Sequence, residues 1–92
     1  MNRSDIVNLI DTQMPQLSSD QVRKGVDMIF ESMSQALANK DRIEVRGFGS
    51  FSVRERQARQ ARNPKTGDKV QVGSYFRPHF KPGKELRARV NA

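Results

Sequence analysis

The 22 residues from 54 to 75 constrain the fold of this chain more than any other segment. They include six basic side chains but no leucine, isoleucine, methionine or phenylalanine, so they cannot supply a hydrophobic core. Residues 63–67 (Asn-Pro-Lys-Thr-Gly) are turn-formers, and residues 69–72 (Lys-Val-Gln-Val) alternate in polarity. Composition alone also permits a disordered loop. The turn and the alternation favour a long β-hairpin, and we predict an arm over residues 54–75 that leaves the body.

The first forty residues predict two helices. Asn2 is a suitable N-cap for the first helix, and Pro15 ends it. Ser18 and Gln21 have the spacing of a capping box at the start of the second helix, which continues as an apolar stripe. Asn39 is expected to end that helix in the left-handed conformation.

From residue 42 onward the hydrophobic period changes from 3.6 to 2, which is typical of strands. Strands over residues 42–46 and 50–53 flank a Gly-Phe-Gly turn. A third strand runs through Pro78, where it is expected to be an edge strand or bulged. Residues 81–83 (Lys-Pro-Gly) break that strand, and a short helix follows over residues 84–90.

These elements predict an α+β fold. It has two N-terminal helices, a three-stranded antiparallel sheet with a long protruding β-ribbon arm, and a short C-terminal helix. We expect a single domain over residues 1–92, with its body formed by residues 1–53 and 76–92.

Dimerisation is expected because the body is small. Without the arm only 70 residues remain, and a domain of about that size buries too little surface to be comfortably stable alone. The chain has no cysteine and one histidine, so neither disulfides nor a multi-histidine metal site can compensate. Two chains can share a core instead. The expected dimer core is Val26, Ile29, Phe30, Met33, Leu37, Phe48, Phe51 and Phe80.

Charge is distributed unevenly along the chain. Residues 1–41 carry four basic and six acidic side chains, whereas residues 42–92 carry thirteen basic and four acidic ones. Such basicity favours a polyanionic partner, either nucleic acid or an anionic membrane; a solvated basic surface without a partner is the plainer alternative. No segment has the pattern of a signal peptide or a membrane helix, so we expect a cytoplasmic or nucleoid location.

No convergent set of reactive side chains can be assembled from the sequence. His79, the single histidine, is expected to be a packed or surface residue. We therefore expect no enzyme activity, cofactor, metal or small-molecule substrate. An RNA-binding role is less favoured than DNA binding, because the chain has one tyrosine and no tryptophan, and its phenylalanines occupy core-like positions.

Duplex DNA suits a basic ribbon. A two-stranded ribbon can follow a groove, and arginine is favoured where the minor groove is narrow. Pro64 at the tip could wedge between base pairs, or it could simply form the turn; the residues alone leave both interpretations open.

Three motifs carry a resemblance to a known family. They are residues 46–51 (Arg-Gly-Phe-Gly-Ser-Phe), 62–67 (Arg-Asn-Pro-Lys-Thr-Gly) and 78–86 (Pro-His-Phe-Lys-Pro-Gly-Lys-Glu-Leu). The chain resembles the bacterial HU/integration host factor family over its full length. The resemblance implies an intertwined dimer whose arms embrace DNA and bend it from the minor groove, as this family is known to do. It also implies a role in recombination, replication and transcription control.

The resemblance also assigns roles to residues. It makes Pro64 the intercalating wedge and places Arg46 in the minor groove, oriented by Glu44. Basic residues near the last helix would hold phosphates. The residues expected to contact DNA are Arg42, Glu44, Arg46, Arg54, Arg56, Arg59, Arg62, Asn63, Pro64, Lys65, Lys69, Arg77, Lys81, Lys84 and Arg87.

Two points stay open at this level. Ala61 stands where arms of the family often have glycine, which leaves the bend of the ribbon near its tip undefined. The predicted strand over residues 42–46 and the run over residues 79–86 are most like the beta-type chains of the family. The chain is therefore expected to act either as a homodimer or as a heterodimer with an alpha-type subunit.

Overall fold

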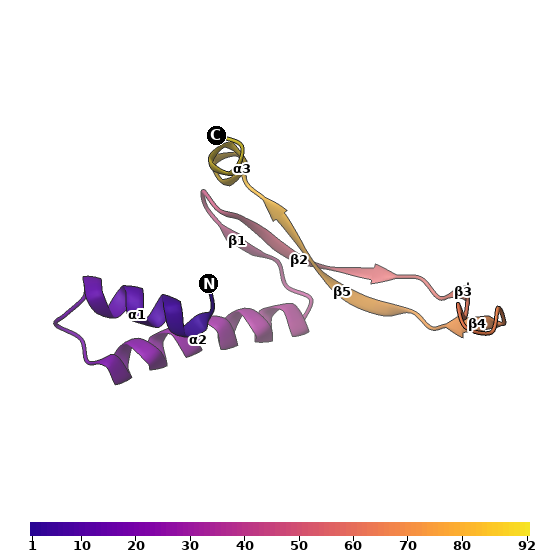
Figure 1. Cartoon of the computed structure of the whole chain (residues 1–92), viewed down its shortest axis with the longest axis horizontal. Coiled ribbons are helices and arrows are strands. Elements are labelled where there is room, and N and C mark those ends of the chain that lie inside the picture. Colours follow the sequence, from indigo (N-terminus) through magenta and orange to yellow (C-terminus); the bar gives the residue numbers. More distant parts are fainter. The chain divides into compact units, whose positions relative to one another are not determined.

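Three helices and five strands make up the computed structural model, which describes all of residues 1–92 (Figure 1). The chain forms two compact units, residues 1–36 and 37–92. The elements are α1 (Arg3–Gln13), α2 (Ser19–Ala38), β1 (Ile43–Val45), β2 (Gly49–Arg56), β3 (Arg59–Arg62), β4 (Lys69–Val72), β5 (Tyr75–Pro82) and α3 (Lys84–Val90). The predicted α+β class and order of elements are confirmed. No helix combines the length and apolarity needed to span a membrane.

Both N-terminal helices begin at capping boxes. The Asp5 N–H donates to Asn2 Oδ1 at 3.0 Å, and the Asn2 N–H donates to the Asp5 carboxylate at 2.8 Å. At α2 the Gln21 N–H donates to Ser18 Oγ at 3.1 Å, and the Ser18 N–H donates to Gln21 Oε1 at 2.9 Å. These bonds satisfy donors that a helix start leaves without partners, so local sequence alone sets both starts.

The end of α2 differs from the expectation. The left-handed residue is Lys40, at φ 65°, and not Asn39. The Lys40 N–H donates to Leu37 O at 3.0 Å, and its Nζ lies 4.3 Å from the centre of the Phe76 ring. A left-handed residue other than glycine costs about 1–2 kcal/mol. The contact with Phe76, far along the chain, offsets part of that cost and cannot be read from the residues around the helix end.

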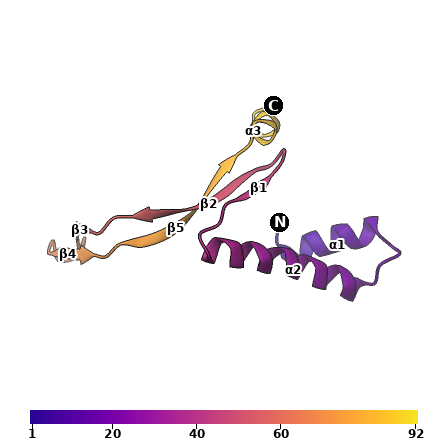
Figure 2. The same ribbon diagram turned by 180° about the vertical axis from the view of Figure 1, so that it is seen from behind.

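The core of the helical unit lies between α1 and α2, which run side by side in Figures 1 and 2. Val7, Val22 and Val26 are buried there. Partly buried side chains surround them, and these are Ile6, Ile10, Leu17 and Phe30. Each buried valine contributes roughly 1.5–3 kcal/mol relative to its exposed state. So small a core agrees with the expectation that the chain needs a partner.

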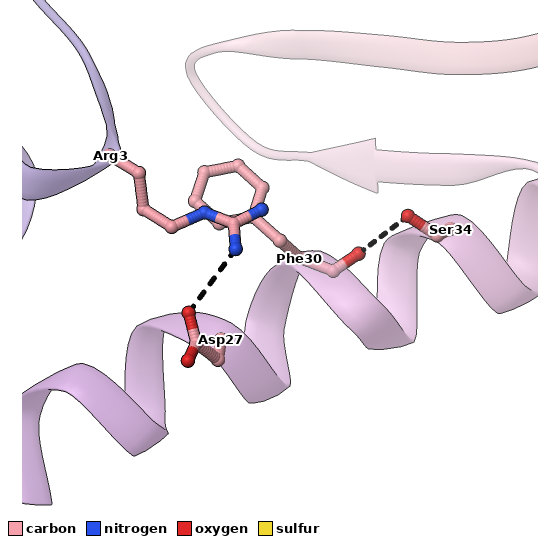
Figure 3. A network of polar contacts seen from close by, with 4 residues as sticks. All are labelled: Arg3, Asp27, Phe30 and Ser34. Carbon is pink, nitrogen blue, oxygen red and sulfur yellow. Dashed lines mark hydrogen bonds and ion pairs between the residues drawn. The ribbon is translucent and has the colours of Figure 1, made fainter.

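One polar network joins the start of α1 to α2 (Figure 3). Arg3 Nη1 lies 3.2 Å from Asp27 Oδ1, and the Arg3 guanidinium carbon lies 5.0 Å from the centre of the Phe30 ring. Ser34 Oγ donates to the Phe30 carbonyl at 2.9 Å. Arg3 is therefore engaged within its own unit.

The three-stranded sheet has the order β1-β2-β5 and is antiparallel. β5 is an edge strand, as expected for a strand that contains Pro78. The strand continues through Pro82, which pairs with Gly49, so the predicted break at residues 81–83 begins too early. The physical reason is the same edge position, which tolerates a residue without an N–H.

Phe48, Phe51 and Phe80 cluster on one face of this sheet. Ring centres lie 4.7 Å apart for Phe51 and Phe80, and 5.4 Å apart for Phe48 and Phe80. Gly49 permits this packing, because a Cβ there would come within 2.5 Å of the Lys81 carbonyl and 2.7 Å of the Phe80 ring. The Gly-Phe-Gly turn is therefore required by a close approach of backbone to side chain.

The predicted arm is a β-ribbon. β2 and β5 stay paired as far as Arg56 and Tyr75, and β3 and β4 then pair from Arg59 with Val72 onward. In Figures 1 and 2 the two long strands continue into β3 and β4 at the end of the sheet unit. The disordered-loop alternative is thus excluded, while the body–arm division at residue 54 stays a prediction.

Candidate nucleic-acid interface

The face of the sheet opposite the phenylalanines is polar and basic. Residues paired in an antiparallel ladder share a face, and alternate residues along each strand share it too. The pairs on this face are Ser50 with Lys81, Ser52 with His79, and Arg54 with Arg77. Glu44 of β1 joins them through its pairing with Ser50.

Two pairs in the ribbon place like charges directly opposite each other. Arg54 pairs with Arg77, and Arg62 pairs with Lys69 near the tip. Like charges at such positions destabilise a sheet. Neither pair is neutralised by an ion pair, since the three ion pairs of the chain involve Arg3, Lys24 and Arg42. A polyanion lying along the ribbon would relieve this repulsion.

The basic residues of the arm are all exposed and free of ion pairs. The structure distributes them along both strands and the tip, and they are Arg54, Arg56, Arg59, Arg62, Lys65 and Lys69. The prediction that these side chains lie on an extended ribbon is therefore confirmed. Their contact with DNA stays a prediction.

No ion pair joins Glu44 to Arg46 in the free chain, and the orientation of Arg46 by Glu44 in the minor groove stays a prediction. Glu44 Oε1 lies 2.9 Å from Arg42 Nη2 instead. Arg42 directly precedes β1 and Arg46 directly follows it, so both basic side chains flank Glu44 along the chain and the ion pair forms with Arg42. Both paired side chains are more than half exposed, and such an ion pair contributes at most about 1 kcal/mol.

A shallow groove of about 470 Å³ lies where the β1–β2 turn meets the end of β5. Arg42, Arg46 and Lys81 contribute its basic lining, with Gly47 and Gly83 among its backbone contributors. Glu44 lines the groove as well, so the structure brings together four of the predicted DNA contacts from two separate segments of the chain.

The junction of β5 and α3 is tied to the same turn. The Gly83 N–H donates to Phe48 O at 2.8 Å, immediately before α3 begins at Lys84. Lys84 and Arg87 are exposed on this short helix. This backbone hydrogen bond therefore fixes the start of α3, which carries the two basic residues, next to the groove.

The tip of the arm is an ordered turn. The Lys65 N–H donates to Asn63 Oδ1 at 2.9 Å, and the Gly67 N–H donates to Asn63 O at 2.7 Å. Gly67 has φ +75°, which side-chain-bearing residues rarely adopt. Pro64 is exposed at this tip. The position of Pro64 in this turn fits both interpretations, and its role as a wedge stays a prediction.

The expected dimer-core residues fall into two groups. Val26 lies in the core between α1 and α2 of its own chain. Ile29 is 59% exposed and Phe48 46% exposed, so they present apolar surface that a single chain does not cover. The remaining members are partly buried, with Phe80 the most exposed at 36%; they are Phe30, Met33, Leu37, Phe51 and Phe80. Their place in a dimer core stays a prediction.

Sequence reasoning missed the uncharged members of the polar face. Ser50, Ser52 and His79 lie among the basic residues through ladder pairing. The alternation of Arg77, His79 and Lys81 was the available signal, since it puts all three on one side of a strand.

Comparison with known proteins gives one consistent result. The family model described as "Bacterial DNA-binding protein" matches residues 1–91. The chain is 57% identical over 91 residues to integration host factor subunit beta of Marinobacter nauticus, covering 99% of this chain and 93% of the relative. It is 55% identical over 91 residues to the same subunit of Azotobacter vinelandii, covering 99% of each.

Solved structures agree in fold. HU from Anabaena, in a cocrystal structure with DNA, matches with a TM-score of 0.86 at 32% identity, covering 98% of this chain and 97% of that one. An HU mutant from Thermotoga maritima matches with a TM-score of 0.67 at 30% identity, covering 98% of this chain and 99% of that one. The capped helical pair, the edge-strand sheet and the basic ribbon are thus the fold of these relatives, and the chain belongs to the bacterial DNA-binding protein family that includes HU and the integration host factor subunits.

Proposed function

We propose that this chain is an architectural DNA-binding protein that acts as a dimer, binds the minor groove of duplex DNA and bends it. The observation that carries this proposal is the basic ribbon, in which like charges face each other across the ladder without carboxylate partners. A free protein gains nothing from that arrangement. Phosphates along a DNA backbone supply the missing negative charge.

Counterion release accounts for the affinity. Each neutralised phosphate contributes about −0.9 to the slope of log affinity against log salt. If all six basic residues of one arm contact phosphates, the arm contributes roughly −5 to that slope. Such binding is strong at low salt and reads little sequence, which suits a protein that compacts or shapes DNA.

Bending is assigned to the tip and supported by the body. Pro64, presented by the ordered turn, would insert between base pairs and open a kink, with Arg62, Asn63 and Lys65 lying beside it in the groove. Arg46 and Lys81 in the groove, together with Lys84 and Arg87 on α3, would hold the flanks of the bent DNA. The energy of these added contacts offsets the cost of deforming the duplex.

Two chains are needed for two arms. The exposed apolar side chains of α2 and of the sheet support dimerisation. The relatives are named as beta subunits, which supports a heterodimer with an alpha-type subunit as the partner assembly, beside a homodimer of this chain. We place the protein in the cytoplasm, on the bacterial nucleoid, where it would support recombination, replication and transcription control without catalysis.

Energy transfer across a labelled duplex tests this function. A duplex of about 35 base pairs carries a donor dye and an acceptor dye at its two ends. It is titrated first with this chain alone and then with this chain and an alpha-type subunit. We expect transfer to rise as the complex forms. Binding without any rise in transfer, in both titrations, would contradict bending, and stronger binding to duplex RNA of equal length would contradict the choice of DNA.

A further inference from the structure

We propose that Lys40 is a positioning residue for the DNA-binding arm, and that its ammonium group holds the base of the ribbon before DNA is bound. The ring that Lys40 contacts belongs to Phe76, which lies on the phenylalanine side of the ribbon and not on its polar side. Lys40 thus acts through the ribbon and not through a contact with DNA. The inference rests on the proposed DNA-binding function and adds to it one residue that restricts the motion of the arm.

The backbone of Lys40 adopts a conformation that ordinarily favours glycine, with φ at 65°. Its N–H donates to Leu37 O at 3.0 Å, a hydrogen bond that a glycine would also make. The lysine side chain adds two further contacts, because Nζ donates to the Ala38 carbonyl at 3.3 Å and lies 4.3 Å from the centre of the Phe76 ring. Lysine at this position therefore links the carbonyl end of α2 to β5, which a residue without a side chain could not do.

The part of the ribbon that Lys40 contacts has no third strand beside it. β1 pairs with β2 only as far as Phe51. From residue 52 to residue 56 the ladder consists of β2 and β5 alone, and a two-stranded hairpin is marginally stable by itself. Phe76 lies in this part, opposite Glu55. Lys40 therefore supports the ribbon beyond the end of the three-stranded sheet.

The charge of Lys40 has no competing partner within the chain. None of the three ion pairs includes Lys40, so its ammonium is engaged by the Ala38 carbonyl and the Phe76 ring. Both are suitable partners for a cation, since the end of a helix carries partial negative charge and the face of an aromatic ring is electron-rich. Phe76 is 53% exposed, so this contact is of the solvent-exposed kind.

Preorganisation connects this contact to DNA binding. An arm that swings freely loses that freedom when it binds, which weakens the affinity, whereas an arm that is already held loses less. The effect cannot exceed the free energy of the contact, because a released arm can still reach the bound position. An exposed cation–π contact of ordinary strength therefore predicts a loss of affinity of about 2- to 5-fold when it is removed.

Motion of the arm in the DNA-free protein tests the positioning role. The chain has no cysteine, so Gln71→Cys on β4 provides a single site for a dye, and time-resolved fluorescence anisotropy measures the amplitude of segmental motion. We expect K40G and F76L to raise that amplitude and K40R, which keeps the cation, to retain it. K40G should unfold in no less urea than wild type at the same protein concentration, because glycine relieves the left-handed strain. A purely structural role would instead lower stability and leave the motion of the folded arm unchanged.

Affinity for the end-labelled duplex is then compared among chains without the dye, namely wild type, K40Q, F76L and the double variant. Each single variant breaks the same contact, so we expect each to bind about 2- to 5-fold more weakly and the double variant to lose no more than that. K24Q is the matched control, since it removes another exposed lysine, and it should leave the motion of the arm at the wild-type amplitude.

The outcomes separate this inference from the proposed function. Weaker binding by K40Q with wild-type affinity in F76L would overturn the inference, because Lys40 would then contact a phosphate directly. Unchanged motion of the arm in both K40G and F76L would overturn it as well, while DNA binding remained intact. Absence of DNA binding by the wild-type chain, alone and with an alpha-type subunit, would instead contradict the proposed function itself.

Discussion

The helical unit and the ribbon of this protein use their charged and apolar side chains in opposite ways. In residues 1–36 the three buried side chains form one core, and basic residues such as Arg3 and Lys24 pair with carboxylates of the same unit. In residues 37–92 no side chain is buried, and apart from Arg42 the basic residues have no ion-pair partners. Arg3 and Lys24 of the first region are therefore paired within the chain, although exposed apolar residues of α2 still await a partner, whereas the basic side chains of the second region are left for a partner outside the chain.

This difference separates residues that stabilise the fold from residues that bind. A ribbon with opposed arginines keeps an unfavourable arrangement that selection for stability alone would remove. The helical pair shows the converse, since its charges lie where they support helix starts and the packing of α1 on α2. Substitutions in the two regions should therefore affect different measurements.

The largest effect is expected from the ribbon charges. Replacing Arg59, Arg62 and Lys69 together by glutamine should weaken DNA binding by about 100-fold or more at moderate salt, and should lower the salt slope by roughly 3 for each arm that carries the substitutions. Affinity measured across a salt series checks both numbers.

Arg3, Arg23 and Lys24 provide the matched control in the helical unit. Their triple replacement removes the same charge but should change the salt slope by less than about 1. Equal losses from the two triple variants would show that net charge, and not the ribbon, drives binding.

Core truncation should produce the reverse pattern. Val26→Ala removes buried methyl groups and should lower the free energy of unfolding by about 1.5–3 kcal/mol, measured by urea denaturation at one fixed protein concentration. Val70→Ala, at a side chain that is 44% exposed on the arm, should change it by less than about 0.5 kcal/mol. A larger loss at Val70 than at Val26 would reverse the assignment of the core.

Substitutions at the tip of the arm should affect the bend of the DNA and the affinity for DNA separately. Pro64→Ala leaves every charge of the arm in place, so we expect the affinity to stay within about tenfold of wild type while energy transfer in the end-labelled duplex falls. Lys65→Gln, next to it, removes a charge and keeps the proline, and should weaken binding with less effect on the bend. An unchanged bend in Pro64→Ala would refute the wedge.

The smallest effect concerns the opposed arginines. Arg77→Gln should stabilise the free protein by about 0.2–1 kcal/mol while weakening DNA binding, because it removes repulsion with Arg54 across the ladder. Thermal unfolding without DNA measures the gain. Arg3→Gln should instead lower stability slightly, since Arg3 is paired with Asp27. A loss of stability in both variants would remove the contrast between the two regions.

Features that depend on neighbours along the chain were predictable from the amino-acid sequence. The capping boxes at Asn2 and Ser18, the strand alternation from residue 42 and the turn at residues 63–67 all need only contacts within a few residues. The arm was predictable for a related reason, since a segment without large aliphatic side chains cannot be packed into a core.

Which side chains meet across the sheet could be seen in the three-dimensional structure alone. Glu44 pairs with Arg42 although Arg46 is equally near along the chain, and the left-handed Lys40 contacts Phe76 from a distant strand. The place of His79 among the cations depends on the register that pairs it with Ser52. Register is a relation between distant segments, and a shift of one residue would turn His79 to the opposite face.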